Sequence, residues 1–327
     1  MKLRSRASGV FVAGTVVILL AACERDGAIG QASDAPEARS IPPSPIAQDQ
    51  AHSPELATRV TNAYPAFSPD GRWIAYMSNA DGDFDIYVMN LTTGVRHQLT
   101  DAMDRDGTPA WSPDGTQIAF QSFRDGHSQV YVMERDGTNQ RNLSRSLSHD
   151  EHPFWTADGQ RLVFASNRPE ADGEEGNIDL YSMSAEGGDV LRITSTPEVE
   201  TYPTLSPDGS RIACRRIMAD GNWEVVVMDA DGRNAQPVAP HEAVDGWPAW
   251  SPDGTRLAFA SARAGSSDLY VLDLATNELH QITFDEERDD RQPWWSPDGR
   301  MLAFSRYMWF PNQPFYEAAE IYVLRVE

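Results

Sequence analysis

Cysteine is nearly absent from this chain, whose 327 residues include only Cys23 and Cys214. Two cysteines are too few for a cysteine-based zinc site, and modification of Cys23, inferred below, would leave no pair for an intramolecular disulfide. Cys214 stands in an apolar, strand-like segment, so we expect it to be a small core residue. Helical periodicity is also missing between the apolar segments, which favours an all-β protein.

Basic residues are scarce as well, because 27 Lys and Arg stand against 49 Asp and Glu, giving a net charge of −22. A surface this acidic repels phosphate backbones and anionic lipid, so we expect no nucleic acid partner. It is compatible with cations or with basic patches on a partner protein. The alternative is that the acidic residues serve only to keep the protein soluble.

Long hydrophobic runs are limited to Val10–Leu20, which is too short for a membrane-spanning helix. The run follows three basic residues and ends in Leu20-Ala21-Ala22-Cys23, which resembles the lipobox of bacterial lipoproteins. We therefore predict that residues 1–22 are a signal peptide and that a lipid on Cys23 is the sole membrane attachment. Glu24, in place of an Asp, favours a periplasmic protein anchored to the outer membrane of a Gram-negative envelope. A plain secretory signal with an incidental cysteine is the alternative.

Residues 23–54 have almost no large apolar side chains, so they cannot bury enough surface to offset chain entropy. We predict a disordered tether over this segment and a folded domain over residues 55–327.

A four-residue turn recurs along that domain with a period of about 45 residues. In each copy Pro presets the first corner and Gly accepts the left-handed conformation that closes a hairpin. The six copies begin at Ser68, Ser112, Thr156, Ser206, Ser251 and Ser296, and the third is degenerate, with Ala157 in place of Pro.

Four apolar, β-branched strand segments surround each turn, which predicts a six-bladed β-propeller of four-stranded antiparallel blades. A solenoid is the alternative, but it needs polar caps that the sequence does not show. The last repeat stops after its third strand, and Leu56–Thr61 resembles a fourth strand. We therefore predict that Leu56–Thr61 completes the last blade and covers its edge.

The repeat resembles the WD-like repeat of TolB-type propellers. Pro109-Ala110-Trp111-Ser112-Pro113-Asp114-Gly115 and Asp268-Leu269-Tyr270-Val271 carry the likeness, which extends over residues 55–327. The resemblance implies a propeller that binds proteins, as TolB does in the periplasmic Tol–Pal system. This chain lacks the α/β domain that precedes the TolB propeller and has a lipobox that TolB lacks, so membership of that system does not follow. A propeller-linked hydrolase is rejected, because no Gly-x-Ser-x-Gly elbow occurs.

Two repeated positions are candidates for a binding site at one mouth of the channel. The position three residues before the strand-one proline holds Asn62, Asp106, Asp150, Glu200, Asp245 and Asp290. These acids either form a negative funnel for a cation or a basic side chain, or each caps its own loop. The residue directly before the proline should face the channel; the six are Tyr64, Thr108, His152, Tyr202, Trp247 and Gln292.

An aromatic insertion in the last repeat, which includes Trp309 and Tyr316, is a third candidate, because aromatic side chains are enriched at interface centres. We expect a monomeric, non-catalytic scaffold without a cofactor, which binds an envelope protein through a basic or helical segment at the channel mouth. The alternatives are a receptor for a small ligand or cation in the channel and a channel-mouth metalloenzyme acting on a glycan. The last is disfavoured because His152 is the only channel-facing histidine.

The segment Asn79–Asp85 resembles a calcium-binding loop in its alternating acidic residues, but Asp-Gly turns explain the pattern.

Overall fold

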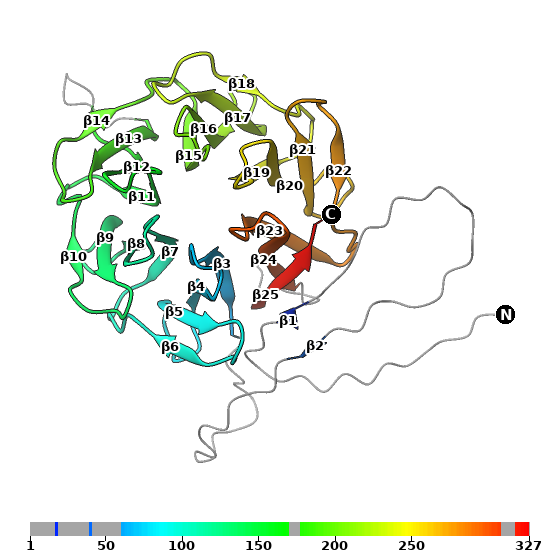
Figure 1. Ribbon diagram of the computed structural model, residues 1–327. Coiled ribbons are helices and arrows are strands. Elements are labelled where there is room, and N and C mark those ends of the chain that lie inside the picture. The colour runs from blue at the N-terminus through cyan, green and yellow to red at the C-terminus, as the bar shows by residue number, and fades with distance from the viewer. Residues whose placement is uncertain (1–16, 19–38, 41–59, 170–176, 309–317, 327) are drawn as a thin grey trace.

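The computed structural model describes residues 17–18, 39–40, 60–169, 177–308 and 318–326. Six antiparallel blades are arranged around a central axis, as predicted, and the described residues contain no helix (Figure 1). Accordingly, none of the described residues forms an apolar helix long enough to cross a membrane.

Each of the first three blades runs outward from the axis in chain order. Blade 1 comprises β3 (Asn62–Phe67), β4 (Trp73–Ser78), β5 (Asp85–Asn90) and β6 (Arg96–Gln98). Blade 2 comprises β7 (Asp106–Trp111), β8 (Gln117–Ser122), β9 (Gln129–Glu134) and β10 (Arg141–Asn142). Blade 3 comprises β11 (Asp150–Trp155), β12 (Arg161–Ser166), β13 (Asp179–Ser184) and β14 (Leu191–Arg192).

The remaining blades follow the same order. Blade 4 comprises β15 (Val199–Leu205), β16 (Arg211–Ile217), β17 (Trp223–Asp229) and β18 (Gln236–Pro237). Blade 5 comprises β19 (Asp245–Trp250), β20 (Arg256–Ser261), β21 (Asp268–Asp273) and β22 (Leu279–Gln281). Blade 6 contains β23 (Arg288–Trp295), β24 (Met301–Met308) and β25 (Ala318–Arg325).

The recurring turn forms the hairpin between the first and second strands of every blade. In blade 1 the Ser68 hydroxyl donates to Asp70 Oδ1 at 2.6 Å, and Asp70 Oδ1 accepts the Arg72 N–H at 3.0 Å. Gly71 has φ 68°, and the six turn glycines lie between 68° and 70°, where a Cβ atom is strained. The repeated sequence is therefore required by backbone conformation.

A β-bulge interrupts the innermost strand of every blade. In blade 1 the register shifts between Ala63 and Ala66, and Tyr64 takes a left-handed φ of 55°. The five equivalent residues lie between 48° and 55°, although none is glycine: Thr108, His152, Tyr202, Trp247 and Gln292. The bulge thus places one side chain of each blade on the lining of the central channel.

The core lies between neighbouring blades. A tryptophan at the end of the first strand reaches across three of these interfaces, and Trp111 Nε1, for example, donates to the Ala66 carbonyl of blade 1 at 3.2 Å. Phe120, Phe164 and other large side chains of the second strands are completely buried. Cys214 is also fully buried, as predicted, and burial raises the pKa of its thiol.

Two short strands lie at the edge of the last blade. β1 (Val17–Ile18) pairs in parallel with β25, placing Val17 opposite Tyr322, and β2 (Arg39–Ser40) pairs with β1. Residues 56–59 of the predicted strand Leu56–Thr61 lie outside the described residues, and Thr61 makes an isolated parallel bridge to Ala319 of β25. That Leu56–Thr61 completes the last blade therefore stays a prediction.

Candidate functional site

The acidic position of the first strand is buried, and each acid contacts an arginine. Asp150 is 0% exposed, accepts a hydrogen bond from the Ser166 hydroxyl at 2.5 Å and lies 2.8 Å from Arg168 Nη2. The other four pairs are Asp106–Arg124, Glu200–Arg216, Asp245–Arg263 and Asp290–Arg306. These carboxylates therefore do not project freely into the channel mouth.

The position of the arginine changes from blade to blade, but the charge balance does not. In blades 2, 3 and 5 a serine faces the acid across the hairpin and the arginine follows two residues later, as with Ser166 and Arg168. In blades 4 and 6 the arginine itself faces the acid, as Arg216 faces Glu200. Blade 1 has no arginine at either of these two positions. Ala80 stands two residues after the facing serine, and the neutral Asn62 replaces the acid.

This matching of charges favours the structural reading of the acidic position over the negative funnel. A buried carboxylate without a cation is strongly destabilising, and the one blade without the arginine has an amide instead of a carboxylate. Burial raises the pKa of Asp150, and Arg168 and Ser166 counteract that shift.

Aromatic side chains meet across the axis and close the channel at the channel-facing position. The hydroxyls of Tyr64 in blade 1 and Tyr202 in blade 4 lie 3.0 Å apart. The His152 ring packs against Tyr202 at a tilt of 37°, with ring centroids 3.7 Å apart, and the Trp247 ring lies 5.9 Å from Tyr202. Of the predicted site residues, the structure therefore brings His152 and Trp247 together around Tyr202.

His152 is held neutral in this layer. Burial lowers its pKa to about 3, and the positive charges of Arg215 and Arg105 contribute to the shift. Its Nδ1 atom has no hydrogen-bond partner and lies 4.0 Å from Glu151 Oε2. A proton on His152 would therefore be strongly unfavourable near pH 7.

A second aromatic layer lies one pleat nearer the hairpin turns. Phe154 of blade 3 and Trp294 of blade 6 approach across the axis, with ring centroids 5.6 Å apart. The equivalent residues of the other blades are small: Ala66, Ala110, Thr204 and Ala249. A hollow extends from these layers to the hairpin turns, with about 1430 Å³ of empty space that includes open solvent at its mouth.

The mouth of this hollow is formed by the hairpin turns themselves. Each turn packs against its neighbour, since a Cβ atom on Gly115, for example, would lie 3.5 Å from Pro69 Cδ of blade 1. Gly209 has no such neighbour because Ala157 replaces the proline of blade 3. The hollow is lined mainly by proline and aromatic side chains and is therefore apolar.

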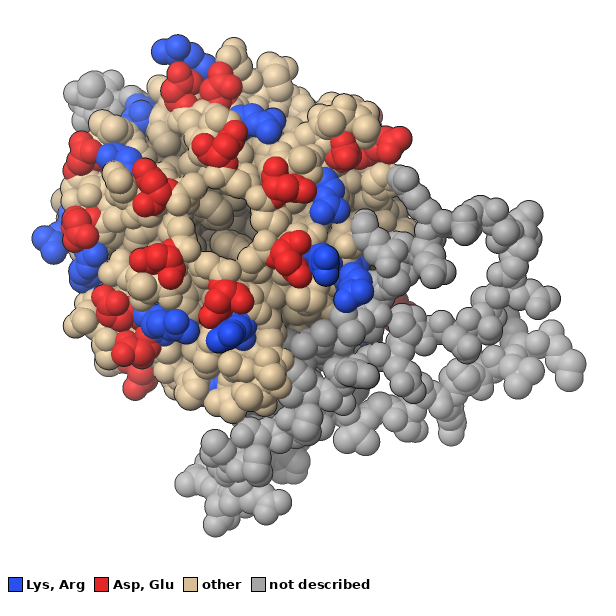
Figure 2. All heavy atoms as spheres, viewed as in Figure 1, with Lys and Arg blue, Asp and Glu red and all other residues tan. Residues whose placement is uncertain are grey.

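Exposed aspartates surround the mouth. All six turn aspartates are exposed: Asp70, Asp114, Asp158, Asp208, Asp253 and Asp298. Figure 2 shows a central hollow on this face with acidic side chains around it. Hydrogen bonds from Ser251 and the Thr255 N–H lower the pKa of Asp253 to about 2, so its charge persists at neutral pH.

The hollow was not predicted from the sequence, although the repeated turn that forms its mouth was the signal for it. We interpreted Pro and Asp of the turn as hairpin chemistry alone, and the structure arranges six such turns around one opening. Cys23, Trp309 and Tyr316, which were predicted to matter, lie outside the described residues.

The first residue of the third strand has a structural role in its blade. Asp85 accepts the Thr100 hydroxyl at 3.0 Å, and Thr100 Oγ1 accepts the Ile86 N–H at 2.9 Å. This arrangement fastens the fourth strand of the blade to the third. Asp179–Thr194 and Asp268–Thr283 repeat it.

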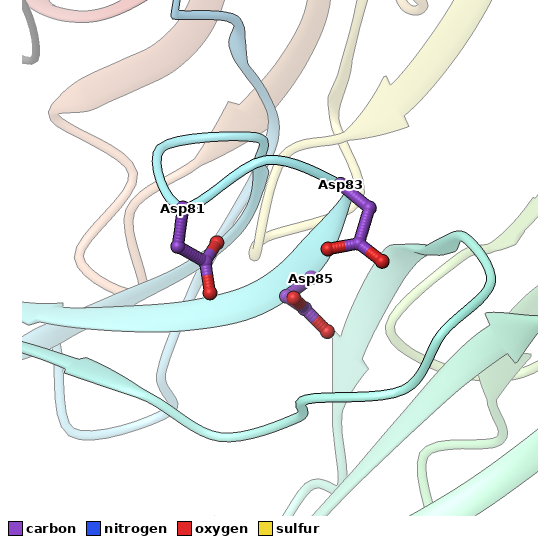
Figure 3. Close-up of side chains that lie close together, drawn as sticks. All are labelled: Asp81, Asp83 and Asp85. Atoms are coloured by element: carbon purple, nitrogen blue, oxygen red, sulfur yellow. The ribbon is translucent and has the colours of Figure 1, made fainter. Parts of the chain in front are cut away.

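Asp85 also belongs to a cluster with Asp81 and Asp83, whose carboxylates face one another (Figure 3). One oxygen of each lies within 4.8 Å of the others, a spacing that would suit a cation. The Gln98 amide nitrogen, however, donates to Asp81 at 2.5 Å and to Asp85 at 3.2 Å, so hydrogen bonds already stabilise part of the cluster. Burial raises the pKa of Asp85 to about 6.

Comparisons with known proteins agree with the architecture. TolB from Acinetobacter baumannii has a TM-score of 0.64 at 23% identity, over 80% of this chain and 60% of that one. A protein assigned as TolB from Agrobacterium tumefaciens gives 0.62 at 20% identity, over 89% and 94%. An oligogalacturonate lyase in complex with manganese gives 0.56 at 20% identity, over 79% and 74%. Identities this low show the fold alone.

No curated protein sequence matches the chain. The sequence profile of the TolB beta propeller domain, however, matches residues 56–236 and 195–308, which include the hairpin turns of all six blades. The likeness first noted in the repeated turns is therefore confirmed, and this chain belongs to the TolB beta propeller domain family.

Proposed function

We propose that this protein is a non-catalytic scaffold of the cell envelope, anchored by a lipid on Cys23, and that it binds a partner protein in the central hollow. The observation that carries the proposal is the hollow itself, which is lined mainly by proline and aromatic side chains. Aromatic pairs meet across the axis beneath its mouth, so the hollow suits insertion of an apolar segment.

The exposed aspartates at the mouth define the partner further. Basic residues that flank the inserted segment would meet six turn carboxylates, and the chain carries a net charge of −22. The partner is therefore basic, as the composition predicted, but it engages the turn aspartates rather than Asp106, Asp150, Asp245 and Asp290. A relation to the Tol–Pal system is part of this proposal; the chain spans 60% of the length of the Acinetobacter TolB.

The geometry around His152 supports a non-catalytic role. The imidazole packs against Tyr202 at a tilt, and its Nδ1 has no hydrogen-bond partner among the described residues. A general base is most effective with a pKa near the working pH, and a pKa lowered to about 3 makes His152 a weak base near pH 7.

Affinity capture from an envelope extract tests the proposal. The parent domain is compared with an Asp114→Asn, Asp253→Asn variant, in which the amide oxygens still accept the turn N–H groups. The matched control is Asp136→Asn, Asp231→Asn, because these exposed aspartates also occupy turns but lie between the third and fourth strands, at the periphery.

We expect one protein to be retained by the parent and the control, to be lost from the mouth variant, and to dissociate as salt is raised. A partner retained equally by all three folded proteins would contradict binding at the mouth. If the folded parent captures nothing, the scaffold proposal loses its basis.

A further inference from the structure

The face opposite the hollow carries an arginine that is enclosed by aromatic rings. Arg215 lies on β16, and its Nε donates to Thr201 Oγ1 at 3.0 Å. Its guanidinium carbon is 4.2 Å from the ring centroid of Trp223, 4.6 Å from that of Tyr202 and 5.4 Å from that of Trp247. Because the side chain is only half-buried, its remaining N–H groups are available to a ligand.

Arg215 differs from its neighbours in lacking an acid. The arginines that stabilise the strand-one acids each lie beside a carboxylate: Arg124, Arg168, Arg216, Arg263 and Arg306. Within the described part of the chain, Arg215 and the exposed Arg105 form no ion pair. Arg211 and Arg256 are also half-buried over tryptophan rings and form no ion pair within the described residues. What sets Arg215 apart is therefore the combination of three aromatic rings around its guanidinium and unsatisfied polar atoms beside it.

Further donors lie beside Arg215 without acceptors. Trp247 Nε1 is buried and has no hydrogen-bond partner in the described residues, and the same holds for His152 Nδ1. An indole N–H is a donor only, so the acceptor that it lacks must come from a ligand or from solvent. Arg105 contributes a second positive charge, which acts on the His152 and Tyr64 side chains.

The opposing charges nearby are few. Glu151 is the acid that acts on both Arg215 and Arg105, and it lies 4.0 Å from His152 without forming an ion pair with either arginine. Arg291, which also lies over Trp247, is already 3.0 Å from Asp289. Arg215 and Arg105 carry two positive charges and Glu151 carries one negative charge, so one further anion would balance the charge at this place.

We propose that this face holds a second binding site, in which Arg215, assisted by Arg105 and the Trp247 N–H, binds a single carboxylate. The apolar body of the ligand lies on Trp223 and Trp247, which also line a surface groove of about 1330 Å³ of empty space. Three acids, Glu286, Glu287 and Asp289, line the same groove against two arginines, Arg288 and Arg291. A ligand with further negative charges is therefore disfavoured. The carboxylate belongs either to a small organic acid or to an acidic side chain of a protein.

Calorimetric titration of the full chain with benzoate and with benzamide tests the proposal, because the two differ in charge and share an aromatic ring. Two end-capped pentapeptides, one with a central Glu and one with a central Gln, represent the protein source. The test variant is Arg215→Met, which keeps an apolar stem against the rings. The control is Arg211→Met, because Arg211 also lies over a tryptophan ring, 4.6 Å from Trp250, at the other end of β16.

We expect benzoate or the Glu peptide to bind at least ten times more tightly than its neutral analogue, and Arg215→Met to remove that preference while Arg211→Met keeps it. Glu151→Gln should tighten binding about threefold or more, because it removes the opposing charge. Tighter binding of benzoate identifies a small acid as the source, and tighter binding of the Glu peptide identifies a protein. If neither anion binds the folded parent, or if both arginine variants bind alike, the site does not exist.

Discussion

The buried ion pair between Asp150 and Arg168 leads to a prediction about the stability of the protein. Replacing Arg168 with Met leaves the carboxylate of Asp150, which is 0% exposed, with only the neutral hydroxyls of Ser166 and Ser144 among the described partners that lower its pKa. Methionine is a suitable replacement because Met218 and Met308 stand at the equivalent position in blades 4 and 6. Removal of one partner from a buried ion pair costs about 3–5 kcal/mol, and we expect a loss in that range.

Replacing Asp150 with Asn is expected to cost less, about 1–2 kcal/mol, because the amide oxygen still accepts Ser166 and Arg168 reaches solvent. The double variant reproduces the uncharged arrangement of blade 1, so its cost should fall at least about 2 kcal/mol below the sum of the single costs.

Urea unfolding followed by tryptophan fluorescence measures these free energies. The defect of Arg168→Met should also shrink as pH falls. Its unpaired carboxyl has a raised pKa when folded, so protonation relieves the penalty, and the penalty grows as pH rises through that pKa. A loss below about 1 kcal/mol, or strictly additive costs, would refute the reasoning that charge matching maintains the acidic position.

Three further predictions concern the turns, the aromatic layer and the anchor. Gly137→Ala should destabilise the protein by more than about 2 kcal/mol, because its Cβ atom would lie 2.7 Å from the Leu99 carbonyl oxygen. Gly126 has the same φ of 87° but no atom within 4 Å of such a Cβ, so Gly126→Ala should cost only the backbone strain of about 1 kcal/mol. Thermal unfolding of the two variants in parallel compares these costs. His152 has a folded pKa of about 3 against an ordinary value near 6.5, so the stability that it contributes is present above pH 6.5 and is lost as pH falls toward 3. Below pH 6.5 the free energy of unfolding of His152→Gln should therefore rise relative to that of the parent by up to about 1.4 kcal/mol per pH unit. If unfolding free energies of parent and variant change equally with pH, the imidazole is not buried and neutral. Cys23→Ser should abolish incorporation of labelled fatty acid into the protein and release it from the membrane fraction, whereas Cys214→Ser should leave both unchanged; retention of the label by Cys23→Ser would show that the lipid is elsewhere.

The two faces of the propeller offer different chemistry near the same axis. The turn face presents carboxylates around an apolar hollow, and the opposite face presents Arg215 and Arg105 over aromatic rings. The aromatic layers that contain Tyr64, Tyr202 and Trp294 separate them. Because these side chains lie between the turn aspartates and Arg215, variants of one face are expected to leave the other unaffected, and each can be tested independently.

The local sequence determined the repeating unit of this protein. The Ser-Pro-Asp-Gly turn permits only a tight hairpin with a left-handed glycine, and apolar strands beside six such turns require a closed radial sheet. The hydrogen bonds of Asp85 and Asp268 are similarly local, because their threonine partners follow the fourth strand of the same blade. These conclusions depend on contacts between residues close in the sequence.

Two kinds of contact were decided only by the tertiary structure: the ion pairs of the acidic position and the contacts between blades across the axis. The sequence placed Asp106, Asp150, Asp245 and Asp290 near the axis but did not indicate that arginines would bury and neutralise them, because the arginine occupies two different positions relative to its acid. Nor did it reveal that Tyr64 meets Tyr202 or that Phe154 meets Trp294, since these pairs come from opposite blades. Strand pattern defines one blade at a time, whereas a site on the axis depends on the side chains that all six blades bring to the centre.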